Sequence, residues 1–221
     1  MSSSWCTATV PADIRVVFAD DTLLVLDKPA GLLSVPGRGE DKQDCLSARV
    51  QNQYQDALVV HRLDMATSGL MLMARGKTAQ QVLNHAFAQR QITKRYVALL
   101  HGRLAPFPGE WGQIDLPIAL DWPNRPRRMV PAEGGKASVT RWRVQEGAGA
   151  AHTRVELEPV TGRSHQLRVH MLAIGHPIIG DTLYFDRPPI DAPRLMLHAS
   201  HMALLHPLGM RPMQFSCEPD F

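Results

Sequence analysis

Short apolar runs with the composition of β-strands recur along this 221-residue chain, and they constrain its fold more than any other feature. Runs rich in Val, Ile and Leu that are bounded by turn residues are typical of strands. Because strands outnumber helices and the two do not alternate regularly, the sequence predicts an α+β fold with a mixed, mainly antiparallel sheet and flanking helices. We expect strands within residues 14–19, 22–29, 57–60, 69–74, 92–104, 136–146, 152–160, 194–207 and 211–219.

Helical patterns are confined to three segments. Residues 44–54 suit a helix with Asp44 as its N-cap. Apolar positions recur at helical spacing over residues 78–90, which predicts the second helix. The third is expected from about residue 165 to 174, with Gly175 as its C-terminal stop.

Turn residues separate these elements. Asp20-Asp21 is expected to form a hairpin turn between the first two strands, and Gly147 and Gly149 to join the strands within 136–146 and 152–160. Residues 121–136 hold too much Pro, Arg and Gly for a regular element, so we expect an exposed basic loop there.

Composition excludes several classes of protein. No apolar run approaches the length of a membrane span, and the N-terminal residues lack the pattern of an export signal, so a cytoplasmic protein is expected. Cys6, Cys45 and Cys217 are odd in number and far apart, which indicates reduced thiols rather than disulfides or a zinc site. The net charge is only +3, but 19 of the 24 basic residues are Arg, which suits contacts with phosphates and bases.

A charged tetrapeptide, His61-Arg62-Leu63-Asp64, interrupts two apolar runs. In one interpretation Asp64 caps the following turn by accepting backbone N–H groups, and Arg62 neutralises it. In the other, the carboxylate stays ionised beside the guanidinium near the core, where it is available as a nucleophile. The pattern alone leaves both open.

Two further segments carry candidate site residues. Arg163 precedes the third predicted helix and is placed to point from a strand-to-helix turn into a cleft, although a single Arg is more often merely a surface residue. Tyr96 directly follows two cations, Lys94 and Arg95, in a predicted strand, an arrangement that suits either stacking on a base or ordinary packing.

Together these segments resemble a known family. "HRLDMATSG", "KRYVALLHG" and "TGRSHQLRVHMLAIGHPIIGD", in that order and preceded by "DKPAGLLSVPG", are similar to the motifs of the RluA family of pseudouridine synthases over essentially the whole chain. The resemblance implies the pseudouridine synthase catalytic fold with RNA-binding loops, and isomerisation of uridine to pseudouridine in RNA.

The resemblance also implies roles for individual residues. Asp64 matches the catalytic aspartate, Arg163 the arginine that pairs with it, and Tyr96 the tyrosine that packs on the target base. Substrate binding is expected from Arg62, which matches a residue that enters the RNA helix, from the adjacent His61 and from Leu167, which matches an apolar pocket position. Phosphate contacts are expected from the basic loop and a second exposed segment, through Arg125, Arg127, Arg128 and Arg38.

The implied partners are RNAs. The "LDWPNRPRRMV" stretch and the chain length resemble a family member that acts on both 23S rRNA and tRNA stem-loops. Many relatives carry an N-terminal S4 RNA-binding domain, but here we expect one catalytic domain over residues 1–221, acting as a monomer without an obligatory protein partner. Since the isomerisation gains or loses no atom and changes no oxidation state, no cofactor or metal is expected.

Two other functions stay open at this point. A carboxylate-dependent glycoside or nucleoside hydrolase needs a second acid or base, and Asp115, Asp121 and Asp181 are available. A noncatalytic RNA-binding protein of the same fold is the other alternative. The sequence also leaves open whether Asp64 acts as a nucleophile or through a glycal.

Overall fold

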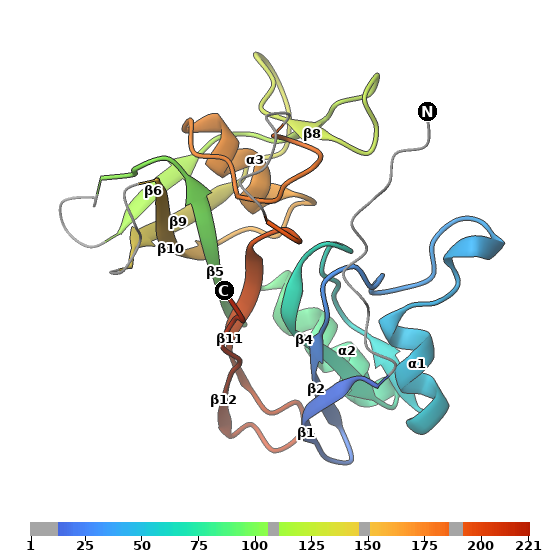
Figure 1. Cartoon of the computed structure of the whole chain (residues 1–221). Helices are drawn as coiled ribbons and strands as arrows, with labels where there is room; N and C mark the ends of the chain where they lie inside the picture. The colour runs from blue at the N-terminus through green and yellow to red at the C-terminus, as the bar shows by residue number, and fades with distance from the viewer. Residues whose placement is uncertain (1–12, 106–110, 146–150, 186–191) are drawn as a thin grey trace. The chain divides into compact units, whose positions relative to one another are not determined.

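The computed structural model describes residues 13–105, 111–145, 151–185 and 192–221 (Figure 1). The chain divides into two compact units. Unit 1 comprises Met1–Lys94 and His198–Asp220, and unit 2 comprises Arg95–Leu197 with Phe221. Within the described ranges strands outnumber helices in both units, which confirms the predicted α+β class. No helix in the described part of the chain is both long and apolar enough to cross a membrane.

Unit 1 is built on the strand order β1-β2-β4-β11, with β3 added to β4 and β12 to β11. All of these pairings are antiparallel except that of β4 with β11. Figure 1 shows α1 and α2 beside this part of the sheet. The elements are β1 (Arg15–Ala19), β2 (Leu23–Lys28), a 3-10 helix (Glu40–Lys42), α1 (Leu46–Gln53), β3 (Ala57–Val59), β4 (Ser68–Arg75), α2 (Lys77–Ala88), β11 (Leu197–Leu205) and β12 (Pro212–Ser216).

One edge of β4 is divided between two partners. β11 pairs with its first residues, Ser68 and Gly69, whereas β3 pairs with its last residues, Met73 to Arg75. Gly69 has a φ of 105° and lies so close to β11 that an added Cβ would stand 2.4 Å from the carbonyl oxygen of Ala199. Only glycine fits this approach, which explains its place directly after the turn.

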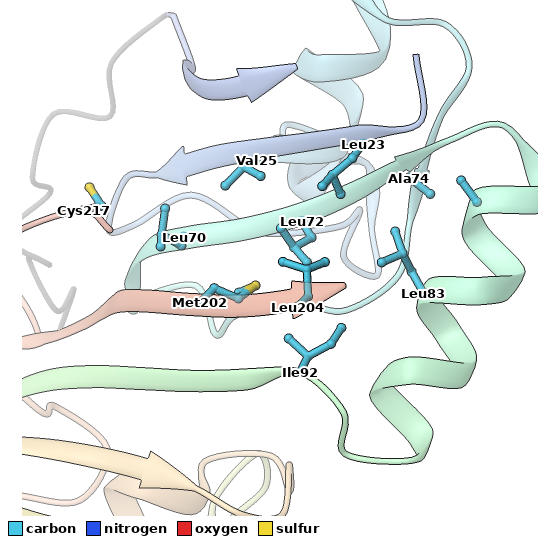
Figure 2. Close-up of a cluster of buried hydrophobic side chains, with 11 residues drawn as sticks. Leu23, Val25, Leu70, Leu72, Ala74, Leu83, Ile92, Met202, Leu204 and Cys217 are labelled. Carbon is cyan, nitrogen blue, oxygen red and sulfur yellow. The ribbon is translucent and has the colours of Figure 1, made fainter. Parts of the chain in front are cut away.

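The core of unit 1 consists of the inward side chains of these strands packed on α2 (Figure 2). Leu23 and Val25 of β2 and Leu70 and Leu72 of β4 belong to this cluster, because successive side chains of a strand point to opposite faces. The residues between them, such as Leu24 and Met71, are equally buried on the other face of the sheet. Leu83 of α2 and the β11 residues Met202 and Leu204 complete the contact, together with Ala74, Ala79, Ile92 and Cys217. The helical periodicity of residues 78–90 is thus the core-facing side of α2.

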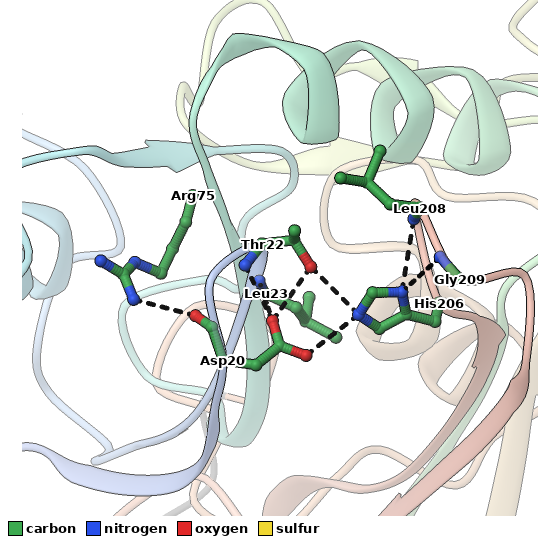
Figure 3. Close-up of polar contacts among 7 residues, drawn as sticks. All are labelled: Asp20, Thr22, Leu23, Arg75, His206, Leu208 and Gly209. Atoms are coloured by element: carbon green, nitrogen blue, oxygen red, sulfur yellow. Dashed lines mark hydrogen bonds and ion pairs between the residues drawn. The ribbon is translucent and has the colours of Figure 1, made fainter.

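The hairpin turn between β1 and β2 forms as predicted, and Asp20 holds it (Figure 3). Its carboxylate accepts the main-chain N–H groups of Thr22 and Leu23, each at 2.8 Å, and pairs with His206 Nε2 at 3.0 Å. Burial by itself would raise the pKa of Asp20, but the hydrogen bonds from Thr22 and His206 outweigh it and hold the pKa below its usual range. The turn is therefore fixed to the segment that follows β11.

Unit 2 has the antiparallel strand order β5-β10-β9-β6 and a separate two-stranded ribbon, β7-β8. In Figure 1, α3 lies beside β9 and β10. The elements are β5 (Thr93–His101), β6 (Gly112–Asp115), β7 (Ala119–Leu120), β8 (Arg128–Met129), β9 (Val139–Val144), β10 (His152–Pro159) and α3 (Gln166–Ala173).

Polar side chains attach α3 to β9. Gln166 donates to the carbonyl of Val139 at 2.9 Å and to the hydroxyl of Thr140 at 3.0 Å, and the two ring nitrogens of His170 lie 2.9 Å from the same hydroxyl and 3.0 Å from the carbonyl of Leu116. Burial lowers the pKa of His170, so its ring stays neutral at neutral pH. The helix therefore docks through satisfied polar groups as well as apolar ones.

Two local predictions are wrong, and two short strands were not predicted. Cys45, not Asp44, is the N-cap of α1, because the Asp44 carboxylate pairs with Arg49 at 2.6 Å instead. The predicted basic loop contains the short strand β8, which pairs with β7. The strands β6 and β7 were missed because each has too few residues to show a pattern. Gly147, Gly149 and Cys6 lie outside the described residues; Cys45 and Cys217 are free thiols.

Candidate active site

The charged tetrapeptide of unit 1 lies in the irregular segment between β3 and β4. Arg62 is exposed, Leu63 is buried and Asp64 is half-buried. The carbonyl of Asp64 accepts the N–H of Thr67 at 3.1 Å, which closes the turn that leads into β4. The turn is thus stabilised by the main chain of Asp64.

Ser34 fixes the residue that precedes Asp64. Its buried hydroxyl accepts the N–H of Leu63 at 3.1 Å and donates to the carbonyl of Leu63 at 2.7 Å. Gly31, from the same loop after β2, donates its N–H to the carbonyl of Met65 at 2.8 Å. The loop that contains "GLLS" therefore holds the main chain on both sides of Asp64.

Lys28, at the end of β2, lies beneath the same segment. Its side chain is fully buried, and Nζ donates to the carbonyl oxygens of Pro29 at 2.8 Å, Leu32 at 2.8 Å and Met65 at 3.0 Å. Burial lowers the pKa of this ammonium to about 7, against the raising effect of the Asp64 charge. Three acceptors match the three protons of the ammonium form, so the protonated lysine binds the segment most completely.

His61 is a structural part of the same segment. Its Nε2 accepts the N–H of Leu72 at 2.8 Å, on the part of the β4 edge between its two partner strands, and its ring packs on Phe87 with centroids 4.5 Å apart. Burial, and then the charge of Lys94, lowers the pKa of His61 to about 3. The ring is therefore neutral, with its proton on Nδ1. Its expected role in substrate binding stays a prediction.

In unit 2, Arg163 lies in an exposed turn just before α3. Its main-chain N–H donates to the side-chain oxygen of Gln166 at 3.0 Å, and its Nε donates to the carbonyl of Ala137 at 3.3 Å. The helix was expected to begin at about residue 165, and it begins at Gln166 after the N-cap His165, whose φ of 57° is left-handed. The side chain of Gln166 reaches back to the N–H of Arg163 and so closes the turn that precedes the helix.

Tyr184 joins this turn to the β7-β8 ribbon. The hydroxyl of Tyr184 lies 2.6 Å from His165 Nδ1 and accepts the main-chain N–H of Arg128 at 2.7 Å. Beside it, Arg168 donates two hydrogen bonds of 2.7 Å to the buried carboxylate of Asp181. Arg168 is therefore structural, whereas Arg163 is exposed.

The remaining predicted residues have varied surroundings. Tyr96 is half-buried in β5, opposite Leu157 of β10, and Leu167 is buried on α3. Arg125 and Arg38 are exposed, while Arg127 and Arg128 are half-buried. Arg127 lies 5.5 Å from the centre of the Tyr184 ring, so part of this cation already has an aromatic contact.

One group in unit 1 has metal-binding residue types. Ligand atoms of Asp27, His198 and Cys217 lie within 4.8 Å of one another. However, the ring nitrogens of His198 are 2.9 Å from the hydroxyl of Ser68 and 3.0 Å from the carbonyl of Cys217. Burial, and next the hydrogen bond to Asp27, raises the pKa of the Cys217 thiol to about 11. These groups satisfy one another through hydrogen bonds, and a metal would have to displace them.

The structure thus brings the predicted residues together in two sets. Asp64, Arg62 and His61 share one segment of unit 1, and Arg163 and Leu167 lie within a few residues of each other in unit 2. Asp64 and Arg163 belong to different units, so the expected ion pair between them stays a prediction. Sequence reasoning missed Lys28, Ser34, Gln166 and Tyr184. A lysine at the end of a largely apolar strand was the one visible signal.

Comparison with known proteins identifies the family. The model of the RNA pseudouridylate synthase family matches residues 22–173. The chain is 47% identical over 207 residues to the dual-specificity RNA pseudouridine synthase RluA of Yersinia pestis, covering 93% of this chain and 99% of that one. It is 46% identical over 211 residues to RluA of Haemophilus ducreyi, covering 94% of each.

A solved structure agrees. Human RNA pseudouridylate synthase domain containing 1 superposes with a TM-score of 0.76 at 28% identity, over 95% of this chain and 85% of that one. The matched range contains the Ser34, Asp64 and Arg163 segments described above. The chain belongs to the RNA pseudouridylate synthase family.

Proposed function

We propose that this chain isomerises specific uridines to pseudouridine in RNA stem-loops, with Asp64 as the catalytic carboxylate. The observation that carries this proposal is the rigid support of Asp64: Ser34 holds the main chain before it, and Lys28 and Gly31 hold the main chain after it. A catalytic group needs such support, because small displacements of a reacting atom cost large factors in rate.

The chemistry breaks the bond between ribose C1′ and base N1, turns the base and joins C1′ to C5. The proton on C5 is lost and N1 gains one, so the product is an isomer of the substrate. Asp64 attacks C1′, supports the positive charge that develops there, or removes a proton from C2′ to give a glycal. All three routes need an ionised carboxylate.

The other residues confine and orient the base. We assign to Arg163 a charge-assisted pair with Asp64 that holds the carboxylate during the reaction. Tyr96 and Leu167 supply an aromatic and an apolar surface that retain the freed base and exclude water. A stacked uridine must be flipped out at a cost of a few kcal/mol, and we assign to Arg62, next to His61 in the chain, the filling of the vacated place.

The substrates we propose are stem-loops of 23S rRNA and of the tRNA anticodon arm, since the matched RluA relatives are dual-specificity enzymes. Exposed arginines, Arg38 and Arg125 among them, would contact the phosphates. No cofactor or metal enters this mechanism. We further propose that a monomer acts in the cytoplasm, with residues 1–221 as one functional catalytic domain.

A hydrolase is less well supported. Asp181 pairs with Arg168 in the interior, and the Asp121 carboxylate accepts the side-chain N–H groups of Asn124 at 3.0 Å. Two of the three carboxylates available as a second acid or base are therefore engaged elsewhere. Retention of the catalytic residues also argues against a binding protein without activity.

The test uses a stem-loop RNA whose uridines carry tritium at C5. The purified protein should release tritium without releasing free uracil, whereas a hydrolase would release the base. Asp64→Asn should bind the same RNA with an unchanged Kd and release no tritium. Tritium release by this variant at the normal rate would contradict the role of Asp64, and mapping pseudouridines in cells with and without the protein would identify the sites.

A further inference from the structure

Trp122 is the most exposed of the large apolar side chains in the described ranges, at 65% exposure, and the one aromatic residue among them. It lies in the tip of the β7-β8 ribbon, residues 121–127. A single exposed apolar residue is common on protein surfaces and needs no explanation by itself. What distinguishes Trp122 is its surroundings.

Arg125 covers part of the indole. The centre of its guanidinium lies 4.3 Å from the ring centroid, the shortest cation-to-ring distance in the described part of the chain. Arginine stacks flat on aromatic rings, and its N–H edges then stay available for phosphate oxygens. Since most of the Trp122 side chain remains exposed, aromatic surface is left open for a second planar group.

The ribbon presents this pair on a fixed backbone. The N–H of Asp121 donates to the carbonyl of Arg127 at 3.1 Å, and the N–H of Arg127 donates to the carbonyl of Asn124 at 3.0 Å. The carboxylate of Asp121 accepts from Asn124. At its base, Tyr184 accepts the N–H of Arg128. A tip held at both ends loses little conformational freedom when it binds.

The charge of the tip selects the kind of partner. Arg125 and Arg127 bring two cations to the tip and Arg128 adds a third at its base, whereas the one acidic residue of the tip, Asp121, is engaged by Asn124. Open aromatic surface beside several arginines is the combination that binds unpaired nucleic acid, since bases stack on the ring and phosphates meet the cations. A protein partner would also use Trp and Arg, but it does not require this excess of positive charge.

We propose that Trp122, backed by Arg125, is a stacking site for an unpaired nucleobase of the RNA substrate. This inference rests on the proposed function, because it takes an RNA stem-loop as the ligand. It adds a contact that does not involve the reacting uridine. The site reads the presence of an unpaired base rather than its identity, since every base offers a flat aromatic face.

Binding to two fluorescently labelled RNAs tests the proposal: a hairpin with an unpaired, uridine-containing loop, and the blunt duplex of the same stem. All variants carry Asp64→Asn, so that no turnover occurs. Trp122→Ala should raise the Kd for the hairpin by about tenfold and leave the Kd for the duplex unchanged. Trp122→Phe should retain most of the affinity. Met210→Ala, at an equally exposed apolar position of unit 1, is the control and should change neither.

Salt dependence separates stacking from charge. Trp122→Ala should leave the slope of log Kd against log salt unchanged, whereas Arg127→Ala should lower it by about one for both RNAs. Equal weakening of hairpin and duplex by Trp122→Ala, or no weakening of either, overturns the stacking site. These assays measure no catalysis, so the site can fail while tritium release by the Asp64 enzyme succeeds, and the reverse.

Discussion

The hydroxyl of Ser34 bridges both main-chain polar groups of Leu63, the residue before Asp64, although the two are 29 positions apart in the sequence. The bridge is buried, so water does not replace it when it is lost. One side chain thus sets the position of the carboxylate that follows.

Ser34→Ala should destabilise the protein and lower its rate of turnover. Leaving the N–H and carbonyl of Leu63 without partners costs about 1–3 kcal/mol for each group. We expect unfolding in urea at a lower concentration and a fall in single-turnover rate of at least tenfold. Thr153→Val is the matched control, because the Thr153 hydroxyl also bridges an N–H, that of Leu104, and a carbonyl, that of Gly102. It should lose similar stability but keep its rate. If both variants lose rate equally, Ser34 has no special link to Asp64.

Lys28→Met should change how stability depends on pH. The folded pKa is about 7 and the ordinary value is 10.5, so between these pH values the unfolded chain holds a proton that the folded chain lacks. The free energy of unfolding of the wild type, minus that of the variant, should therefore rise with pH by up to about 1.4 kcal/mol per unit in this window. Urea unfolding of both proteins at pH 6, 8 and 9.5 measures this difference in free energy. The contributions of the other titrating groups cancel, because both proteins contain them.

The turnover rate of the wild type, unlike its relative stability, should fall as the pH rises. Above pH 7 the neutral amine loses one hydrogen bond to the main chain around Asp64 and the charge beside the carboxylate. Single-turnover rates should fall through this pH, and the fall should be absent from the pH profile of Lys28→Met, whose rate is lower throughout. An identical profile for both proteins would show that Lys28 does not titrate in the active range.

Arg163→Ala should reduce turnover by about 100-fold or more with little effect on RNA affinity, because it removes the group that we propose orients Asp64. Arg163→Lys should recover only part of the rate, since an ammonium cannot form a bidentate pair. Arg141→Ala, which removes another arginine of unit 2 that is paired with Glu158, is the control. Wild-type turnover of Arg163→Ala would remove the proposed ion pair from the mechanism.

Tyr184→Phe should impair catalysis more than binding. The substitution keeps the ring but releases His165 and the N–H of Arg128, which the hydroxyl joins. We expect a fall in kcat of about tenfold with a nearly constant Kd for the stem-loop, because the turn that bears Arg163 becomes less well placed. Tyr54→Phe in unit 1 should have no effect. A rise in Kd with unchanged kcat would instead assign Tyr184 to RNA binding alone.

The parts of the fold that depend on local signals could be predicted from the sequence. The turn at Asp20, the periodicity of α2 and the stop at Gly175 each lie within a few residues of their cause. The short strands β6 and β8 carry too few residues for a pattern, and β8 lies in a segment that Pro and Arg mark as irregular.

The candidate site was predicted only in part for a related reason. Asp64 and Arg163 could be proposed as site residues because their motifs resemble those of a family. The supporting residues could not be found, because Ser34 and Lys28 act on main-chain groups 29 and 37 positions away. A hydroxyl or ammonium in a loop carries no sign of which distant carbonyl it will bind.

The divided edge of β4 has a consequence for how substrate and enzyme adjust to each other. The eight residues from Val60 to Thr67 connect β3, which pairs with the last residues of β4, to the first residue of β4. Between these two points, His61 is hydrogen-bonded to Leu72 of the same strand. A connection held at both ends and in between cannot shift far toward a bound nucleotide. In the proposed reaction it is therefore the RNA that changes conformation to bring the uridine to Asp64. An insertion of even one residue into this connection should be tolerated far less than in an ordinary surface loop.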